Sequence, residues 1–204
     1  MSRRLIIFDF DGTIADTYPV FLAFVSREGF RFDAGEAGEL RDLSLREAVK
    51  RLGIPDRKLL AFVRKFRRYF RKTCDELPLI EGVSDAIARL HEEGYLLAIL
   101  STNDTRNIRK ILKREGMWQY FDIVRSERNI FGKARSIRRL VRKVGFAPSA
   151  TWYVGDEVRD IEAAREAGVR SVAVTWGFNS DAALRASHPD SLVSTPSELS
   201  DVFS

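Results

Sequence analysis

The chain has little cysteine and histidine, and it lacks a long apolar run. It contains one cysteine, Cys74, and two histidines among 204 residues, so an internal disulfide is excluded. A chain of this kind suits a reducing compartment, and we expect a cytoplasmic protein in which Cys74 packs rather than reacts. No stretch approaches the roughly 18 apolar residues of a membrane span, and Asp9 interrupts the first apolar run too early for a signal peptide. The sequence therefore predicts no membrane partner.

The excess of positive charge in the chain is confined to one segment. The net charge is +5, and residues 17–77 hold 14 Lys and Arg against 9 Asp and Glu. This segment therefore carries the whole excess, and the rest of the chain is neutral. A basic segment is most often a solvated surface, but it could also attract an anionic substrate or a nucleic acid.

An apolar stretch followed by two closely spaced acids begins the chain. Residues 5–8 are all apolar, which predicts a buried strand of a parallel sheet. Side chains at i and i+2 of an extended segment point the same way, so Asp9 and Asp11 are directed together where Gly12 lets the chain bend. Two adjacent acids are costly unless a cation or a reaction uses them. The alternative is a plain turn from strand to helix, capped by an Asp or by Thr13.

The spacing of apolar residues divides the rest of the chain into two parts. Residues 18–77 show helical stripes and no obvious strand, which predicts a helical insertion. From Pro78 onward, helix and strand patterns alternate, which is typical of a parallel sheet. The expected strands after Pro78 are residues 96–100, 121–124, 152–154, 172–174 and 192–193. The predicted fold class is therefore α/β, with a Rossmann-like parallel sheet core, helices on both faces and an inserted helical segment.

Hydroxyl side chains follow the second predicted strand. Ser101 and Thr102 stand where that strand ends, and hydroxyls with unpaired N–H groups at such a place can hold phosphate oxygens. Capping of the next helix is the alternative for either residue. Because the carboxyl ends of parallel strands lie at one edge of a sheet, we expect both residues near Asp9 and Asp11.

Two more aspartates follow the strand at residues 152–154. Asp156 comes after a glycine turn and can reach a hard cation from the strand end, while Asp160 lies one helical turn further. Glu157 between them is expected to support the site without binding a metal. A capping Asp at an acidic helix start explains one aspartate, but it does not explain a third strand that ends in acids or hydroxyls.

Together these segments resemble the motifs of the haloacid dehalogenase superfamily, whose phosphatases use an aspartate nucleophile. The similarity is greatest to members like phosphoglycolate phosphatase that carry a small helical cap. It implies a core domain of residues 1–16 and 78–204 and a cap domain of residues 17–77. It also selects Lys133, which follows Gly132 at the start of a basic helix. The Lys-Pro pair common among relatives is absent here, so Arg135 remains a competitor.

The resemblance implies a Mg²⁺-dependent phosphomonoesterase that acts on a small phosphorylated metabolite. Asp9 would attack phosphorus, and Asp11 would act as general acid and base. The presence of Asp11 favours ester hydrolysis over halide displacement, since only an alkoxide needs a proton. The implied site residues are Asp9, Asp11 (through its carbonyl) and Asp156 for the metal, Ser101, Thr102 and Lys133 for the phosphate, and Asp160 and Thr13 in support.

Two other functions stay open at this point. A phosphosugar mutase could use the same residues and return the phosphoryl group to a sugar. A basic nucleic-acid-binding module could use residues 64–72 as its contact helix, but it would leave the acids unexplained, so nucleic acid is not an expected partner.

Two arginines flank a polar stretch in the insertion, where relatives have a substrate-specificity loop. Arg41 or Arg46 could grip a carboxylate or a second polar group of the substrate with paired hydrogen bonds. Each could equally lie on an exposed helix face.

Overall fold

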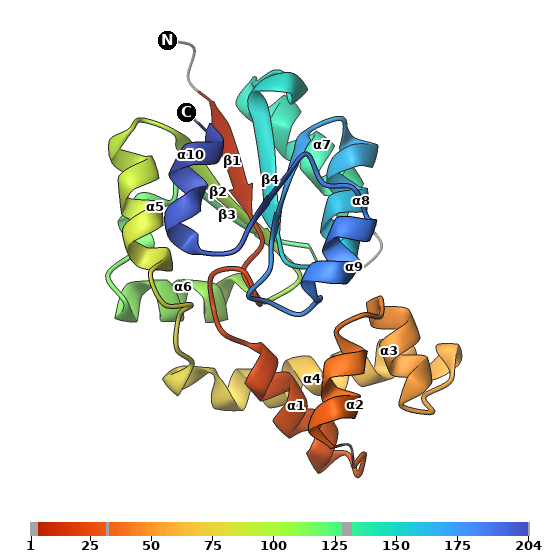
Figure 1. The fold of residues 1–204 in the computed structure, drawn as a ribbon. Coiled ribbons are helices and arrows are strands. Elements are labelled where there is room, and N and C mark those ends of the chain that lie inside the picture. Colours follow the sequence, from red (N-terminus) through yellow and green to blue (C-terminus); the bar gives the residue numbers. More distant parts are fainter. Residues whose placement is uncertain (1–3, 32, 128–131, 204) are drawn as a thin grey trace.

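The computed structural model describes residues 4–31, 33–127 and 132–203 (Figure 1). Across these residues one parallel sheet forms, with the strand order β3-β2-β1-β4-β5-β6. The strands are β1 (Leu5–Phe8), β2 (Leu96–Ser101), β3 (Ile123–Ser126), β4 (Thr151–Gly155), β5 (Arg170–Val174) and β6 (Ser191–Val193). The predicted α/β fold class with a Rossmann-like parallel sheet is confirmed.

Both faces of the sheet are covered by helices, as the apolar runs of the strands require. Alternate residues of β1 enter different cores, because successive side chains of a strand point to opposite faces. Ile6 and Phe8 pack on the side of α5 (Val83–Glu92), α6 (Thr105–Arg114) and α10 (Leu199–Phe203). Leu5 and Ile7 pack on the side of α7 (Lys133–Val144) and α8 (Val158–Ala167). α9 (Asp181–Ala186) joins α8 against β5.

The predicted helical insertion lies at the edge where β1 and β4 end (Figure 1). Its helices are α1 (Tyr18–Arg27), α2 (Ala34–Leu40), α3 (Leu45–Arg51) and α4 (Asp56–Thr73). An aromatic core holds α1 against α4, with the ring centroids of Phe24 and Phe62 5.1 Å apart and those of Phe21 and Phe66 5.6 Å apart. No helix among the described residues is long and apolar enough to span a membrane.

The structure differs from the expected elements in a few places. α2 was not predicted because its short sequence contains two glycines, although the capping box of Asp33 and Glu36 marks its start. α9 and α10 were also missed. β3 lies two residues later than expected, because the turn at Trp118–Tyr120 carries Phe121 into the core before the ladder begins at Ile123.

Candidate active site

The predicted site residues converge at the carboxyl ends of three neighbouring strands. Asp9 and Asp11 follow β1, Ser101 is the last residue of β2, and Asp156 follows β4. The ladder sets these ends side by side, since Phe8 pairs with Ile99 of β2 and with Val154 of β4. Open α/β sheets form their ligand sites at such an edge.

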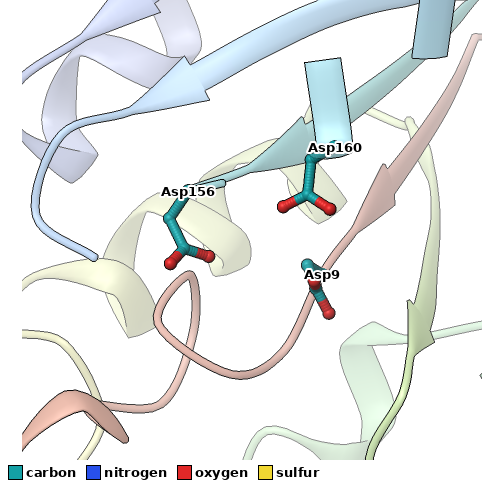
Figure 2. Close-up of side chains that lie close together, drawn as sticks. All are labelled: Asp9, Asp156 and Asp160. Carbon is teal, nitrogen blue, oxygen red and sulfur yellow. The ribbon is translucent and has the colours of Figure 1, made fainter. Parts of the chain in front are cut away.

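Three buried carboxylates lie close together at this edge. One oxygen from each of Asp9, Asp156 and Asp160 lies within 4.8 Å of the others, and all three residues are at most 2% exposed. Figure 2 shows them converging from the end of β1, the end of β4 and the first turn of α8. An all-oxygen donor set of this kind fits a hard divalent cation such as Mg²⁺.

A buried lysine bridges two of these carboxylates. Nζ of Lys133, the first residue of α7, lies 2.6 Å from Oδ2 of Asp9 and also pairs with Asp160. Burial alone lowers the pKa of Lys133, but the charges of Asp160 and Asp9 outweigh burial and raise it well above its ordinary value. Arg135, the competitor from the sequence, is exposed on α7. Lys133 is therefore the cation that the fold brings to Asp9.

Asp156 is enclosed by glycines and by hydrogen-bond donors. Oδ1 of Asp156 accepts a hydrogen bond from the hydroxyl of Thr13 at 2.6 Å, and Oδ2 accepts one from the main-chain N–H of Phe178 at 2.8 Å. A Cβ at Gly12 or Gly177 would come within 2.2 Å of Asp156 Oδ2, so only glycine allows this close approach. Gly12 also has a φ of 76°, which favours glycine.

The acidic cluster has more negative charge than its cations balance. Burial, and then the charges of Glu157, Asp160 and Asp9, raise the pKa of Asp156 well above its ordinary value. Lys133 neutralises one carboxylate charge of the three-aspartate cluster. A bound divalent cation would offset the remainder, so the charge of the site and its donor set both fit Mg²⁺.

The carboxylate of Asp11 lies apart from the cluster and faces the end of β2. It accepts a hydrogen bond from the amide of Asn103 at 2.9 Å and a longer one, 3.4 Å, from the hydroxyl of Ser101. Burial, and then the charge of Asp9, raise the pKa of Asp11 to about 7, while the bond from Asn103 opposes this rise. A carboxyl with such a pKa can both donate and accept a proton near neutral pH.

The two hydroxyl candidates lie in different surroundings. Ser101 is fully buried, and its Oγ also accepts from the main-chain N–H of Asn103 at 3.2 Å. Thr102 is half-buried and lines the cleft above Asp11. Asn103 was not among the predicted site residues. The only sequence feature that could have selected it is its place directly after the two hydroxyl residues.

A cleft between the helical insertion and the sheet opens onto Asp11. It encloses about 90 Å³ and is mostly apolar, with a few polar side chains beside Asp11. Its lining residues include Phe21, Phe62, Phe66, Phe70, Phe178, Arg67, Glu157 and Arg159. Arg159 pairs with Glu157 at 2.5 Å, and its buried Nε and Nη1 have no partner among the described residues. No pattern in the sequence selected Arg159.

Of the two arginines that flank the polar stretch of the insertion, Arg41 has contacts that the structure describes. The guanidinium of Arg41 donates to the main-chain carbonyls of Gly177 at 2.7 Å and of Thr175 and Phe178 at 3.3 Å. Arg41 therefore links the insertion to the loop after β5, and these bonds use the donors that a substrate carboxylate would need. The side chain of Arg46 lies outside the described part of the chain.

Comparison with known proteins agrees with this architecture. The family model described as "Haloacid dehalogenase-like hydrolase" matches residues 6–174, so the chain belongs to this family of hydrolases. A phosphoglycolate phosphatase of Synechococcus elongatus is 39% identical over 201 residues, which cover 96% of this chain and 95% of that protein. A probable phosphatase of Dickeya dadantii is 29% identical over 223 residues, which cover 97% of this chain and 92% of that protein.

Solved structures share the fold along the whole chain. A haloacid dehalogenase-like hydrolase of Streptococcus pneumoniae has a TM-score of 0.80 at 24% identity, covering 100% of this chain and 99% of that chain. At this identity the likeness shows the fold alone. The predicted family resemblance is thus confirmed by the family model, by the curated relatives and by the fold.

Proposed function

We propose that the protein is a Mg²⁺-dependent phosphatase that hydrolyses small phosphate monoesters through an aspartyl-phosphate on Asp9. Its membership of a hydrolase family and its similarity, over almost the whole chain, to a phosphoglycolate phosphatase make the chain a phosphatase. Beyond this activity, we propose the metal, the roles of the residues and the kind of substrate. The observation that carries them is the contact of Asp9 with Lys133 beside Asp156 and Asp160.

Asp9 is suited to act as the nucleophile. Its Oδ1 accepts from the main-chain N–H of Phe10 at 2.7 Å and its Oδ2 from Lys133, so the carboxylate is held in one orientation. An oxygen of Asp9 attacks phosphorus, the ester P–O bond breaks, and the phosphoryl group is transferred to the carboxylate. The ammonium of Lys133 offsets the negative charge that gathers on the phosphoryl oxygens.

Asp11 is suited to move the protons of both steps. With a pKa of about 7 it holds a proton in part of the molecules at neutral pH, and it gives that proton to the leaving alkoxide. The resulting carboxylate then takes a proton from the water that attacks the aspartyl-phosphate. The P–O bond to Asp9 breaks, inorganic phosphate leaves, and both carboxyl groups return to their starting states.

One Mg²⁺ would be held by the carboxylates of Asp9 and Asp156 and by the main-chain carbonyl of Asp11. When bound, it supplies positive charge against the phosphoryl oxygens. The hydroxyl of Thr13 orients Asp156 through its 2.6 Å hydrogen bond. Asp160 pairs with Lys133 and accepts from the main-chain N–H of Glu157 at 3.2 Å, so its proposed role is to orient the lysine.

The hydroxyl of Ser101 or Thr102 would complete the phosphate site together with Lys133. We further propose that residues 17–77 act as a cap domain over a core of residues 1–16 and 78–204. The cleft between them is small and encloses Asp11, which supports a small metabolite as substrate and closure against water. The single cysteine supports a reducing, cytoplasmic location.

Phosphate release from a panel of phosphorylated acids and sugars tests the proposal. We expect turnover by the wild type, and none by Asp9→Asn, which should also fail to take up label from a radioactive phosphate ester. Asp201→Asn, an exposed aspartate of α10, is the matched control and should keep full activity. Full turnover by purified Asp9→Asn would refute the nucleophile assignment. Isomerised sugar phosphate without net phosphate release would favour the mutase instead.

A further inference from the structure

We propose that a pocket between α4 and the loop after β2 binds a second phosphate group of the substrate, so that bisphosphorylated metabolites are preferred. This inference rests on the proposed phosphatase function and adds the chemical class of its substrate. The pocket encloses about 390 Å³ next to the cleft over Asp11. Its lining residues are Arg64, Arg67, Arg68, Arg71, Thr102, Asn103, Asp104, Arg106, Asn107 and Ser126.

The arginines of α4 form a single stripe along the helix. Arg64, Arg67, Arg68 and Arg71 are separated by steps of three and four residues, so their side chains share one face. Like charges at this spacing destabilise a helix. The repulsion is relieved when an anion binds among them.

Three arginines of the pocket lack an acidic partner among the described residues. Asp104 is the acid of the lining, and it lies 3.5 Å from Arg106. Arg64, Arg68 and Arg71 make no ion pair with any residue in the described part of the chain. Among the described residues, Arg64, Arg68 and Arg71 therefore line the pocket without a carboxylate partner.

The excess of cations suits a phosphate better than a carboxylate. One arginine satisfies a carboxylate with two parallel hydrogen bonds, and further guanidinium groups then add little. A phosphate group carries up to two charges and three terminal oxygens, and it can accept from several arginines at once. The number of arginines in the pocket therefore indicates a phosphate.

The pocket adjoins the cleft over Asp11, and the two share part of their lining. Thr102, Asn103 and Arg67 line both, and the amide of Asn103 donates to Asp11 at 2.9 Å. A substrate with its reacting phosphate at Asp9 can therefore extend past Asn103 and place a second phosphate among the arginines. A single molecule that reaches both spaces gains from both sets of contacts, whereas two separate anions bind independently.

A comparison of substrates with one and two phosphate groups tests the inference. The measured quantity is kcat/KM for glucose 1,6-bisphosphate divided by kcat/KM for each of its monophosphates, with 3-phosphoglycerate as the carboxylate comparison. We expect the wild type to prefer the bisphosphate. Arg68→Gln should lower the ratio about tenfold, as expected for loss of a charge-assisted hydrogen bond, and Arg64→Gln combined with Arg68→Gln should lower it further.

Arg57→Gln is the matched control. Arg57 is exposed in the first turn of the same helix, outside the pocket, and its loss changes the net charge equally. An unchanged ratio in Arg57→Gln supports a local site, and an equal fall in Arg57→Gln and Arg68→Gln overturns it in favour of general attraction. A wild-type preference for 3-phosphoglycerate, or for the monophosphates, also overturns it. If para-nitrophenyl phosphate and all the esters release no phosphate, the proposed function itself has failed.

Discussion

Nζ of Lys133 lies 2.6 Å from Oδ2 of Asp9, and both side chains are almost completely removed from solvent. Lys133 also pairs with Asp160, so one buried cation holds two buried anions. Removing one partner from such a group destabilises the fold, because a charge that has lost its hydration is then left unpaired. The proposed nucleophile is therefore positioned by an interaction that the fold itself needs.

Replacing Lys133 with Met should destabilise the protein by about 3–5 kcal/mol and remove phosphatase activity, since two buried carboxylates lose their partner. Urea unfolding in chelator-containing buffer measures the loss. Lys113→Met, on the exposed side of α6, should change stability by less than about 0.5 kcal/mol. If Lys133→Met is as stable as Lys113→Met, the ion pair is not needed by the fold. The combination of Lys133→Met with Asp9→Asn should recover part of the loss.

The acidic part of the site could be predicted from the sequence because it depends on local patterns, in which acids directly follow strands. Asp9 and Asp11 follow a strand, and so does Asp156, and the carboxyl ends of parallel strands meet at one edge. The same rule indicated Ser101. Lys133 required the family resemblance, since a lysine at the start of a basic helix has no distinguishing pattern of its own.

The rest of the site depends on contacts between distant segments, which no local pattern encodes. Phe178 donates to Asp156 from a loop after β5, and Arg41 reaches that loop from the insertion. The partners of Arg41 are more than 130 residues away in the chain. These contacts of Arg41 could not be predicted from the sequence, because an arginine's sequence neighbours do not reveal which carbonyls the tertiary fold brings to it.

Metal should stabilise the wild type through its acidic cluster. We expect Mg²⁺ to raise the melting temperature and to restore the turnover that a chelator abolishes, and we expect Asp156→Asn to lose both effects. In chelator-containing buffer, Asp156→Asn should melt higher than the wild type, because burial and the charges of Glu157, Asp160 and Asp9 oppose ionisation of Asp156. Asp201→Asn is the control for charge. Equal turnover with and without metal, in protein shown to be metal-free, would contradict the magnesium site.

The metal-free protein should lose stability as the pH rises from about 4 to about 7. The pKa of Asp11 is raised from its ordinary 3.8 to about 7, so in this range the folded state binds more protons than the unfolded state. The unfolding free energy therefore falls with increasing pH, by at most about 1.4 kcal/mol per pH unit for this one group. Urea midpoints measured across the range in chelator-containing buffer measure the slope. Asp11→Asn should flatten the slope, and an unchanged slope would exclude Asp11 as its source.

The bonds of Arg41 should couple the insertion to the metal site. Arg41 donates to the main-chain carbonyls of Gly177 and Phe178, and the N–H of Phe178 donates to Asp156. Asn179 strengthens the link, since its amide donates to the carbonyl of Arg41 at 2.8 Å while its carbonyl accepts from the N–H of Val158. Loss of the Arg41 side chain should therefore loosen the loop that orients Asp156.

We expect Arg41→Ala to raise the Mg²⁺ concentration needed for half-maximal turnover about tenfold, in line with the loss of hydrogen bonds from a charged donor. Titration of turnover with Mg²⁺ measures this. Arg51→Ala is the matched control, because Arg51 is 63% exposed and pairs with the equally exposed Glu39, an interaction worth little. The combination of Arg41→Ala with Asn179→Ala should cost less than the sum of the single changes, because both side chains hold the same loop. Strict additivity would mean that Arg41 and Asn179 do not hold the loop together. A rise in KM with an unchanged Mg²⁺ requirement would mean that Arg41 acts on the substrate and not through Asp156.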